Sequence, residues 1–282
     1  MHDAAEGQPI REFQVFVDDG TARSRGRGNI CLDPEGRFLV DALEPGERTV
    51  RIFVRGYMPH ETRISLEPGE TGQVFAEVER GASVSGRLTN AGGNPVTGAR
   101  VFTVGEKEAR QYRPQGTTTA YVNAADGLVS ALSFDVGLPD EARSGDDGTF
   151  LLEGVRPGPT LLRIDHPRFS KRILGPIDAP AEGLLSLGDI RLDSGAAIEG
   201  IVLGAEGRPV RGGTVHIQPM GDDGPVDTYL YVPIGKDGTY RKEGLEPGRV
   251  WIRIYGIEET GREVELELGS TLRADFRIPA TE

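Results

Sequence analysis

Five tyrosine and arginine residues have the types and spacing that suit ligand binding. Tyr229 and Tyr231 lie two residues apart, and side chains at this spacing share one face of a strand. Two rings on one face could form an exposed aromatic shelf for a sugar ring. Tyr112, Arg113 and Tyr121 lie in a second stretch that also holds a run of three threonines. For each tyrosine taken alone, packing in a core or at a sheet edge is the competing interpretation.

Paired aspartates before a glycine are the best candidates for binding a metal ion. Asp146 and Asp147 precede Gly148, and Asp222 and Asp223 precede a glycine in the same way. Carboxylate oxygens in loops suit Ca²⁺, but the known twelve-residue calcium loop needs further acidic residues and a closing glutamate, which the sequence lacks. We therefore interpret the aspartates as caps that accept hydrogen bonds from backbone N–H groups in turns. We expect no cofactor, with calcium as the most plausible ion.

The sequence lacks the motifs of the common enzyme classes. Its four histidines, His2, His60, His166 and His216, begin no H-x-x-E or H-E-x-x-H pattern of a zinc site. No G-x-S-x-G elbow, phosphate-binding loop or dinucleotide fingerprint occurs. The single cysteine, Cys31, excludes an internal disulfide, and we interpret it as a small buried side chain on a strand. We expect no enzymatic activity.

Charge and composition exclude two further classes of protein. The net charge of −12 at pH 7 argues against nucleic-acid binding, which needs a basic surface. No apolar run approaches the roughly 20 residues of a membrane-spanning helix, and the first thirty residues hold no signal-peptide apolar segment. Forty glycines and 19 prolines among 282 residues favour many short strands and turns.

A short block recurs three times and predicts a repeat protein. Its copies span residues 36–46, 148–158 and 238–248. Each begins with glycine, carries Phe or Tyr two residues later (Phe38, Phe150 or Tyr240) and ends in Pro-Gly. Alternating apolar and charged residues follow each copy, a pattern of strands with one buried and one wet face. We predict an all-β fold in which the three aromatic residues anchor the cores, and we expect Trp251 in a core as well.

A second block precedes the first and opens with a strand. Its two clear copies are Val84-Ser-Gly86 with Pro95 and Val101, and Ile198-Glu-Gly200 with Pro209 and Val215. The N-terminal copy is weaker, and an offset of 200 places Met1 opposite Ile201. We predict that the first sandwich lacks its first strand, which is either upstream in a longer polypeptide or absent. The edge exposed in this way should be the least protected part of the chain.

The two blocks divide the chain into three units, residues 1–80, 81–194 and 195–282. Each unit has the size of a small β-sandwich. A single glycine separates the last strand of one unit from the first strand of the next, which predicts a semi-rigid straight or bent rod. The second unit is 24 residues longer than the third between the two blocks, and the extra residues lie within about 105–140. This insertion is expected either to carry function or to be a solvated hairpin.

Together the two blocks resemble the carboxypeptidase regulatory-like domain over nearly all of the chain. The matching residues of the second unit are Gly86, Pro95, Val96, Gly98, Ala99, Val101, Asp147, Gly148, Phe150, Val155, Pro157, Gly158 and Leu162. The resemblance implies a prealbumin-like, Ig-like β-sandwich of about seven strands, a fold whose relatives include carbohydrate-binding domains. Domains of this family serve as stalks of bacterial surface proteins, as spacers beside hydrolases and as accessory domains of outer-membrane receptors.

These observations predict a non-enzymatic structural or adhesion scaffold, a segment of a bacterial extracytoplasmic or cell-surface protein. The alternative is a carbohydrate-binding accessory module that uses the insertion of the second unit. An enzyme is the third choice. The expected partners are a glycan or another surface protein, with no nucleic acid and no membrane insertion, and the chain is expected to belong to a longer polypeptide. The expected location is extracellular, at the cell surface or periplasmic.

Overall fold

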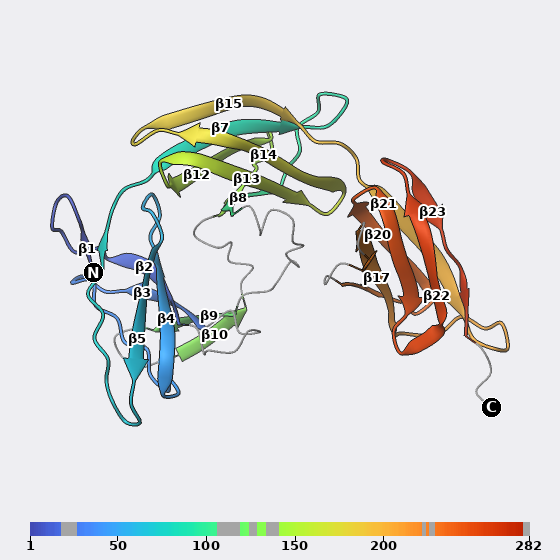
Figure 1. The fold of residues 1–282 in the computed structure, drawn as a ribbon, viewed down its shortest axis with the longest axis horizontal. Coiled ribbons are helices and arrows are strands. Elements are labelled where there is room, and N and C mark those ends of the chain that lie inside the picture. The colour runs from blue at the N-terminus through green and yellow to red at the C-terminus, as the bar shows by residue number, and fades with distance from the viewer. Residues whose placement is uncertain are drawn as a thin grey trace.

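The structure, a computed structural model, consists of β-strands joined by turns and loops. It describes residues 1–17, 27–105, 119–123, 129–133, 141–221, 224–225 and 229–278. The strands form three groups along an arc, with the two termini at opposite ends (Figure 1). Within the described residues, no helix is long and apolar enough to cross a membrane. We refer to residues 1–80, 81–194 and 195–282 as repeats 1, 2 and 3.

The described residues of repeat 1 contribute six strands to two sheets. They are β1 (His2–Asp3), β2 (Glu12–Val17), β3 (Arg27–Leu32), β4 (Gly46–Phe53), β5 (His60–Leu66) and β6 (Glu77–Val78). Strands β3, β2, β4 and β5 are neighbours in this order and pair antiparallel. Strands β1 and β6 form a separate parallel pair.

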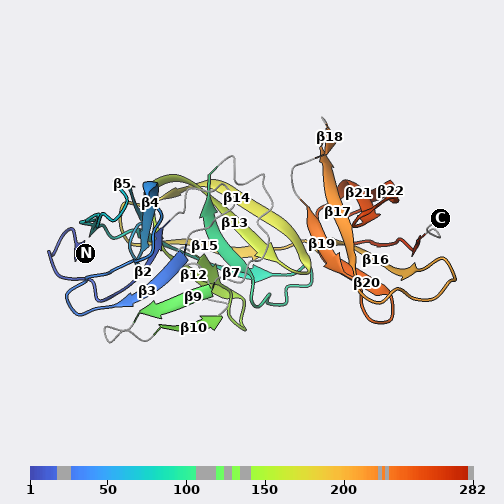
Figure 2. The ribbon, with the colours of Figure 1, turned by 90° about the horizontal axis from the view of Figure 1, so that it is seen from below.

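Two strands from the insertion of repeat 2 extend the larger sheet of repeat 1 (Figure 2). Strands β9 (Thr119–Asn123) and β10 (Val129–Ser133) form an antiparallel hairpin, and β9 pairs in parallel with β3. The described backbone of the insertion is thus a hairpin, and whether the insertion carries function stays a prediction. Because it pairs with β3, it covers an edge that would otherwise offer free backbone groups to other chains.

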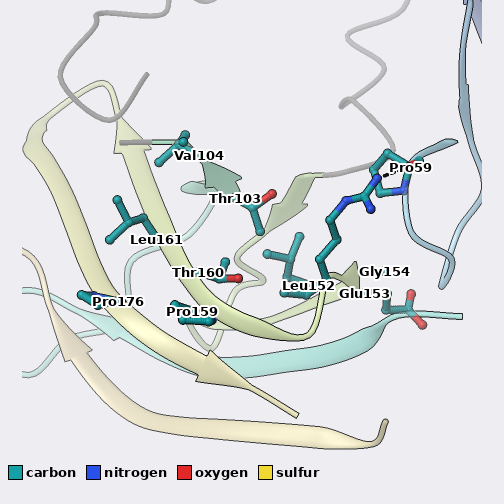
Figure 3. A pocket seen from close by; sticks show the side chains of 13 residues that line it. Pro59, Thr103, Val104, Leu152, Glu153, Gly154, Pro159, Thr160, Leu161 and Pro176 are labelled. Carbon is teal, nitrogen blue, oxygen red and sulfur yellow. Dashed lines mark hydrogen bonds between the residues drawn. The ribbon is translucent and has the colours of Figure 1, made fainter. Parts of the chain in front are cut away.

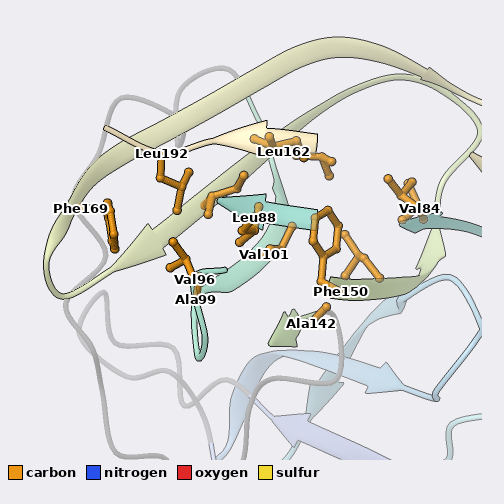
Figure 4. Close-up of a cluster of buried hydrophobic side chains, with 14 of the residues drawn as sticks. Val84, Leu88, Val96, Ala99, Val101, Ala142, Phe150, Leu162, Phe169 and Leu192 are labelled. Carbon is orange, nitrogen blue, oxygen red and sulfur yellow. The ribbon is translucent and has the colours of Figure 1, made fainter. Parts of the chain in front are cut away.

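Besides this hairpin, the part of repeat 2 that the structure describes contains seven strands. They are β7 (Ala82–Thr89), β8 (Arg100–Val104), β11 (Glu141–Arg143), β12 (Thr149–Val155), β13 (Gly158–His166), β14 (Phe169–Ala179) and β15 (Leu184–Arg191). One sheet has the order β11-β8-β13-β14 and the other β12-β7-β15. Leu88, Phe150 and Leu162 from both sheets are buried in one cluster between them (Figure 4).

Repeat 3 repeats this arrangement. Its strands are β16 (Ala196–Leu203), β17 (Thr214–Gly221), β18 (Gly224–Pro225), β19 (Leu230–Pro233), β20 (Thr239–Leu245), β21 (Gly248–Ile254), β22 (Ile257–Leu266), β23 (Thr271–Arg273) and β24 (Phe276–Arg277). One sheet has the order β20-β16-β23, with β24 also beside β16, and the other has the order β18-β17-β21-β22, with β19 also beside β17. The first strands β7 and β16 therefore occupy the same central place.

The predicted all-β class with tandem sandwiches is confirmed. The buried apolar side chains fall into one main cluster within each repeat, at residues 1–78, 82–192 and 196–276. Cys31 lies in the first cluster, as predicted, and burial raises the pKa of its thiol to about 11. The unit boundaries at residues 80/81 and 194/195 stay a prediction.

The recurring glycine–aromatic block plays the role in the core that its sequence predicts. Phe150 and Tyr240 are each 4% exposed. Gly148 and Gly238 both have φ of +80°, a conformation that favours glycine. A Cβ at Gly148 would also collide with the carbonyl oxygen of Leu88 on β7. The block therefore holds its strand directly against the first strand of the same repeat.

Repeat 1 lacks most of its first strand, as predicted. β1 has two residues, whereas β7 and β16 have eight each. Phe38, the counterpart of Phe150 and Tyr240, is half-buried instead of buried. The core of repeat 1 is thus less completely covered than the other two.

Candidate functional site: two joints and an aromatic patch

The structure brings together two of the five predicted ligand-binding residues. Tyr229 precedes β19 and Tyr231 lies in it, and both rings face the same side chain of β17. The backbone of Tyr121 lies in β9. Tyr112 and Arg113 lie outside the described residues. The predicted shelf of two rings is present as geometry, and a ligand-binding role for any of the five stays a prediction.

The shared neighbour of these rings is a histidine, and the four residues His216, Tyr229, Tyr231 and Tyr255 form what we call the aromatic patch. His216 stacks with Tyr229 and with Tyr231, each at 4.6 Å between ring centroids and with interplanar angles of 14° and 29°. Tyr255 meets His216 edge-on at 5.8 Å. The three tyrosines are 39%, 60% and 62% exposed in sequence order.

His216 is the buried centre of the aromatic patch. It is 4% exposed, and its Nε2 atom has no hydrogen-bond partner within the described structure. Burial lowers the pKa of His216, and the nearby Arg253 lowers it further, while Glu258 acts in the opposite direction. The imidazole ring is therefore neutral near pH 7, and it stacks with the tyrosine rings as an uncharged aromatic group. His216 is paired across the strands with Tyr231, a contact set by the register of β17 and β19 and not visible in the local sequence.

Trp251 lies on the outer face of this sheet, so its predicted core position is wrong. On β21, Val250, Ile252 and Ile254 are buried, which leaves Trp251 on the opposite side of the strand. The indole ring lies against Gly261 of β22, where a Cβ would come within 2.7 Å of Trp251 Cζ2. The alternation in β21 is correct, but it buries the even-numbered residues.

The outer face of β17, β19 and β21 therefore carries aromatic and charged groups side by side. Cross-strand pairing places Arg253 opposite His216, and Arg253 forms an ion pair with Glu258. Exposed aromatic faces beside charged hydrogen-bonding groups suit sugars or aromatic peptide side chains. Nothing in this arrangement supplies a nucleophile with an adjacent base.

The cap predicted for Asp147 is present, and Asp33 and Asp237 form similar caps at the other two recurring blocks. Asp147 Oδ1 accepts hydrogen bonds from the backbone N of Thr149 (2.9 Å) and from its Oγ1 (2.7 Å). Asp237 does the same with Thr239, at 3.1 and 2.7 Å. Asp33 accepts from backbone N–H groups in the first copy. These bonds lower the pKa of each of the three carboxyl groups.

The described residues form no site that would bind the expected calcium ion. Within the described residues, no three acidic, histidine or cysteine side chains gather in a way that could hold a metal ion. Asp222 and Asp223 lie outside the described residues. Of the two described candidates, Asp147 uses one oxygen for its own turn and Asp146 is exposed beside it.

The joint between repeats 1 and 2 is a three-way contact of backbone. Gly81 connects the repeats and packs on β12, where a Cβ at Gly81 would lie 2.6 Å from Gly154 Cα. Gly154 has φ of +75° and packs against the backbone of Tyr57. A Cβ at Gly154 would collide with the carbonyl oxygen of Tyr57. Tyr57 belongs to the turn between β4 and β5. No side chain larger than hydrogen fits at either glycine without movement of the backbone.

The joint between repeats 2 and 3 uses the two equivalent glycines, which meet a different residue of the preceding turn. A Cβ at Gly195 would lie 2.5 Å from Gly244 Cα on β20. Gly244, with φ of +71°, faces Pro167 in the turn between β13 and β14, and a Cβ at Gly244 would lie 2.8 Å from Pro167 C. The same three-way contact therefore occurs twice in the chain.

Backbone hydrogen bonds repeat at the two joints as well. In the first joint, Met58 N donates to Glu79 O (2.8 Å) and Gly81 N donates to Gly56 O (3.1 Å). In the second joint, Ser170 N donates to Asp193 O (3.0 Å) and Gly195 N donates to Arg168 O (3.2 Å). Each joint thus ties the connecting segment to a turn of the preceding repeat by the same pair of bonds.

Ion pairs across the joints are less alike. Arg55 Nε lies 2.7 Å from Glu153 Oε2 in the first joint, and Lys171 Nζ lies 3.0 Å from Glu246 Oε2 in the second. Arg55 is 87% exposed and Glu246 is 57% exposed. Pairs with such exposure contribute little in water. Backbone packing is therefore the shared feature of the joints.

A hollow of about 510 Å³ lies beside the first joint, between Pro59 of repeat 1 and strands β8, β12 and β13 of repeat 2 (Figure 3). Its charged lining residues already have partners. Glu153 binds Arg55, and Arg156 Nη2 donates to the carbonyl oxygen of Pro59 at 2.6 Å. The hollow is therefore bounded by contacts of the joint itself.

Comparison with known proteins identifies distant structural likeness alone. No family model and no curated protein sequence matches the chain. The solved structures that match include the Bacillus anthracis TIE protein, at 11% identity and a TM-score of 0.27, with 99% of this chain and 49% of that chain covered. The minor pilin GBS52 of Streptococcus agalactiae matches at 13% identity and a TM-score of 0.30, with 71% of this chain and 98% of that chain covered. BcpA, the major pilin subunit of Bacillus cereus, matches at 13% identity and a TM-score of 0.26, with 100% of this chain and 98% of that chain covered. The chain spans about half the length of the TIE protein.

Proposed function

We propose that the chain is a non-enzymatic, semi-rigid scaffold that spaces or displays other parts of a bacterial extracytoplasmic or cell-surface protein. The observation that carries this proposal is the occurrence of one joint twice, with the same glycines and backbone hydrogen bonds. A linker that only connects two domains accepts residues larger than glycine, and its contacts differ from one linker to the next. A joint in which backbone meets backbone holds the next unit at a set angle.

The proposal includes the unit boundaries at residues 80/81 and 194/195, which place Gly81 and Gly195 at the start of each following unit. It also includes membership of repeats 2 and 3 in the carboxypeptidase regulatory-like class. The roles of Phe150 and Tyr240 in the cores and of Asp147 in its turn support that motif assignment.

Small-angle scattering tests the semi-rigid scaffold. The parent chain should fit one bent shape with a narrow range of maximum dimensions. The double variant Gly81→Ala, Gly195→Ala should give a broader range, because each Cβ must push two backbone segments apart. Gly105→Ala is the matched control, since a Cβ at Gly105 would have no atom of the described residues within 4 Å.

Two results would contradict the proposal. A parent chain that requires a broad ensemble of shapes would show that the joints do not restrict motion. Scattering from the double variant that coincides with that of the parent and of Gly105→Ala would show that the glycine contacts do not define the angle.

A second candidate function is glycan binding, and we place it at the aromatic patch instead of the insertion. The observation that favours it is the exposure of three tyrosine rings around one buried histidine. A glycan array should give a specific signal that Tyr231→Ala reduces by at least about tenfold, equal to about 1.4 kcal/mol. Tyr121→Ala serves as the comparison, since it tests the insertion. A blank array removes this candidate, and a loss with Tyr121→Ala alone moves the site.

A further inference from the structure

The turn between β13 and β14, residues 166–169, carries contacts of the joint between repeats 2 and 3, and we call it the joint turn. It lies at the end of repeat 2 that faces repeat 3 (Figure 1). Arg168 O accepts a hydrogen bond from Gly195 N at 3.2 Å. The backbone of Pro167 packs against Gly244 on β20. A change in the shape of the joint turn therefore moves repeat 3 relative to repeat 2.

The side chain of His166 closes the joint turn. Its Nδ1 atom accepts a hydrogen bond from Arg168 N at 3.1 Å, and its ring meets the ring of Phe169 edge-on at 4.9 Å between centroids. A second hydrogen bond joins the imidazole to the backbone of Thr97, in the loop before β8. Because Nδ1 is an acceptor, the neutral ring carries its proton on Nε2, which donates to the carbonyl of Thr97. Both nitrogens of the neutral ring thus have a partner.

Protonation of His166 removes the hydrogen bond that shapes the turn. An imidazolium ring carries hydrogens on both nitrogens, so Nδ1 can no longer accept from Arg168 N. Burial lowers the pKa of His166, and the charge of Arg168 lowers it further, whereas the bond to Thr97 acts in the opposite direction. The closed turn therefore binds the proton less tightly than the open turn, and a fall in pH favours the open turn.

The charged groups around the joint turn offer no compensation for a positive ring. Among the described residues, Arg168 is the charged side chain that acts on His166, and no carboxylate does so. The loop before β8, residues 90–98, has no charged side chain. Two cations of the neighbouring strands, Arg172 on β14 and Lys242 on β20, lie opposite Ile164 and Ile198.

Other charged residues on the segments around the joint turn already have partners. These pairs are Arg163–Asp165 on β13, Arg100–Glu141 between β8 and β11, Lys171–Glu246 between β14 and repeat 3, Arg191–Asp193 before Gly195, and Arg241–Glu243 on β20. His166 is therefore the group of this turn whose charge changes between neutral and mildly acidic pH.

The joint between repeats 1 and 2 has no counterpart of this histidine. Gly56 O accepts from Gly81 N as Arg168 O accepts from Gly195 N, which places Val54 at the position of His166. Val54 is buried and cannot titrate. The pairing of β9 with β3 also connects repeats 1 and 2. A fall in pH should thus act on the second joint and leave the first unchanged.

We propose that His166 makes the joint between repeats 2 and 3 a pH-sensitive hinge, closed while the ring is neutral and open once it is protonated. The inference rests on the proposed semi-rigid scaffold, since a joint must hold an angle before acid can release it. Repeat 3 is then held at a set angle near pH 7.5 and is released below the ordinary histidine pKa of about 6.5.

Single-molecule energy transfer measures each joint separately in the intact chain. Dyes at the exposed positions Glu182→Cys and Glu267→Cys span the second joint, and dyes at Arg63→Cys and Glu182→Cys span the first. Cys31 stays unlabelled, because it is buried and the pKa of its thiol is about 11. From pH 7.5 to pH 5.0, the spread of distances across the second joint should widen by at least about twofold, with no change across the first.

Two substitutions of His166 separate protonation from packing. Asparagine offers a side-chain oxygen near the position of Nδ1 and cannot titrate, so His166→Asn should keep the narrow spread at both pH values. His166→Ala removes the acceptor and should give the wide spread at both. His60→Asn, in repeat 1, is the matched control and should respond to pH as the parent does.

Three results would overturn the hinge. The first is an equal spread across the second joint at pH 7.5 and pH 5.0. The second is a widening in His166→Asn as large as that of the parent, which would assign the response to another group such as His216. The third is an equal widening across both joints. A wide spread across both joints already at pH 7.5 would instead contradict the semi-rigid scaffold, and the hinge with it.

Discussion

At the scale of single residues, the chain uses the smallest side chains where its parts must meet most closely. Gly81 and Gly195 are recognisable in the sequence as lone linkers. The reason that each must be glycine lies elsewhere, in Gly154 and Gly244 about fifty to seventy residues away. Sequence reasoning finds the repeated position, whereas the steric cause requires the packed structure.

The turn aspartates should make stability sensitive to acid. Hydrogen bonds from Thr149 and Thr239 lower the pKa of Asp147 and Asp237 in the folded chain. A carboxyl group with a lowered folded pKa stabilises fully above its unfolded value of about 3.9, and that contribution is lost as the pH falls through the folded pKa. The variant Asp147→Asn, Asp237→Asn should therefore melt at a lower temperature than the parent at pH 7, and lose less on transfer from pH 5 to pH 3.

Thermal melting followed by circular dichroism measures this difference. Asp146→Asn is the matched control, because Asp146 is exposed in the same turn as Asp147. An acid response of the double variant as steep as that of the parent would contradict the role of the two caps.

His216 should destabilise repeat 3 at mildly acidic pH. Burial lowers its folded pKa below the unfolded value of about 6.5, so the unfolded chain binds the proton more tightly. The resulting stability is present above about pH 6.5 and falls as the pH drops toward the folded pKa. His216→Phe keeps a ring between Tyr229 and Tyr231 but cannot titrate, so its melting temperature should fall less than that of the parent between pH 7.5 and pH 5.5.

Fluorescence of Trp251 reports this transition, because it is the single tryptophan and lies in repeat 3. His2→Gln, in repeat 1 and exposed, should leave the Trp251 transition unchanged at both pH values. Equal pH responses of the parent and His216→Phe would show that protonation of His216 does not affect folding.

At the scale of strands, the recurring block and the first strand depend on each other. Residues 149–155 and 239–245 are strands because β7 and β16 pair with them. Residues 37–43 have the same pattern, with Phe38 in place of Phe150, yet form no strand. Pattern alone therefore predicts the face that is buried, whereas pairing decides whether the segment is a strand.

Hydrogen exchange of the chain alone should reveal this dependence. Amides of residues 37–43 should exchange at least about tenfold faster than those of residues 149–155 and 239–245, since strand pairing protects the latter two. Mass spectrometry of peptic fragments resolves the three segments. Equal protection of all three would show that the core of repeat 1 needs no first strand.

Most of the fold could be predicted from the sequence because the three repeats can be aligned with one another. The glycine and aromatic positions recur at constant spacing in all three repeats, and the aspartate does so in repeats 2 and 3. In these two repeats the structure gives the three positions the predicted roles. The aromatic patch was predicted in part, through Tyr229 and Tyr231. Its centre, His216, lies on β17, and its third ring, Tyr255, lies in the turn between β21 and β22. Nothing local in the sequence joins residues that meet through cross-strand register. Register also explains the error at Trp251.

At the scale of the whole molecule, the arc of three repeats results from two similar joints in succession. In each joint the connecting glycine meets the backbone of the following repeat, and repeats 1 and 2 are also connected by the pairing of β9 with β3. The acidic charge of −12 has little influence on that contact, because the shared elements are backbone groups.

Salt should separate the two kinds of contact that cross the joints. At 1 M salt the Debye length falls to about 3 Å from about 8 Å at physiological ionic strength, which screens exposed pairs such as Arg55–Glu153 and Lys171–Glu246. If the glycine contacts hold the angle, the maximum dimension from small-angle scattering should be the same at both salt concentrations. Arg55→Ala should also scatter like the parent, whereas Gly81→Ala should differ at either concentration. A parent chain that extends or broadens in 1 M salt would assign the angle to the ion pairs, and the repeated glycines would then serve the folding of each repeat instead of the shape of the rod.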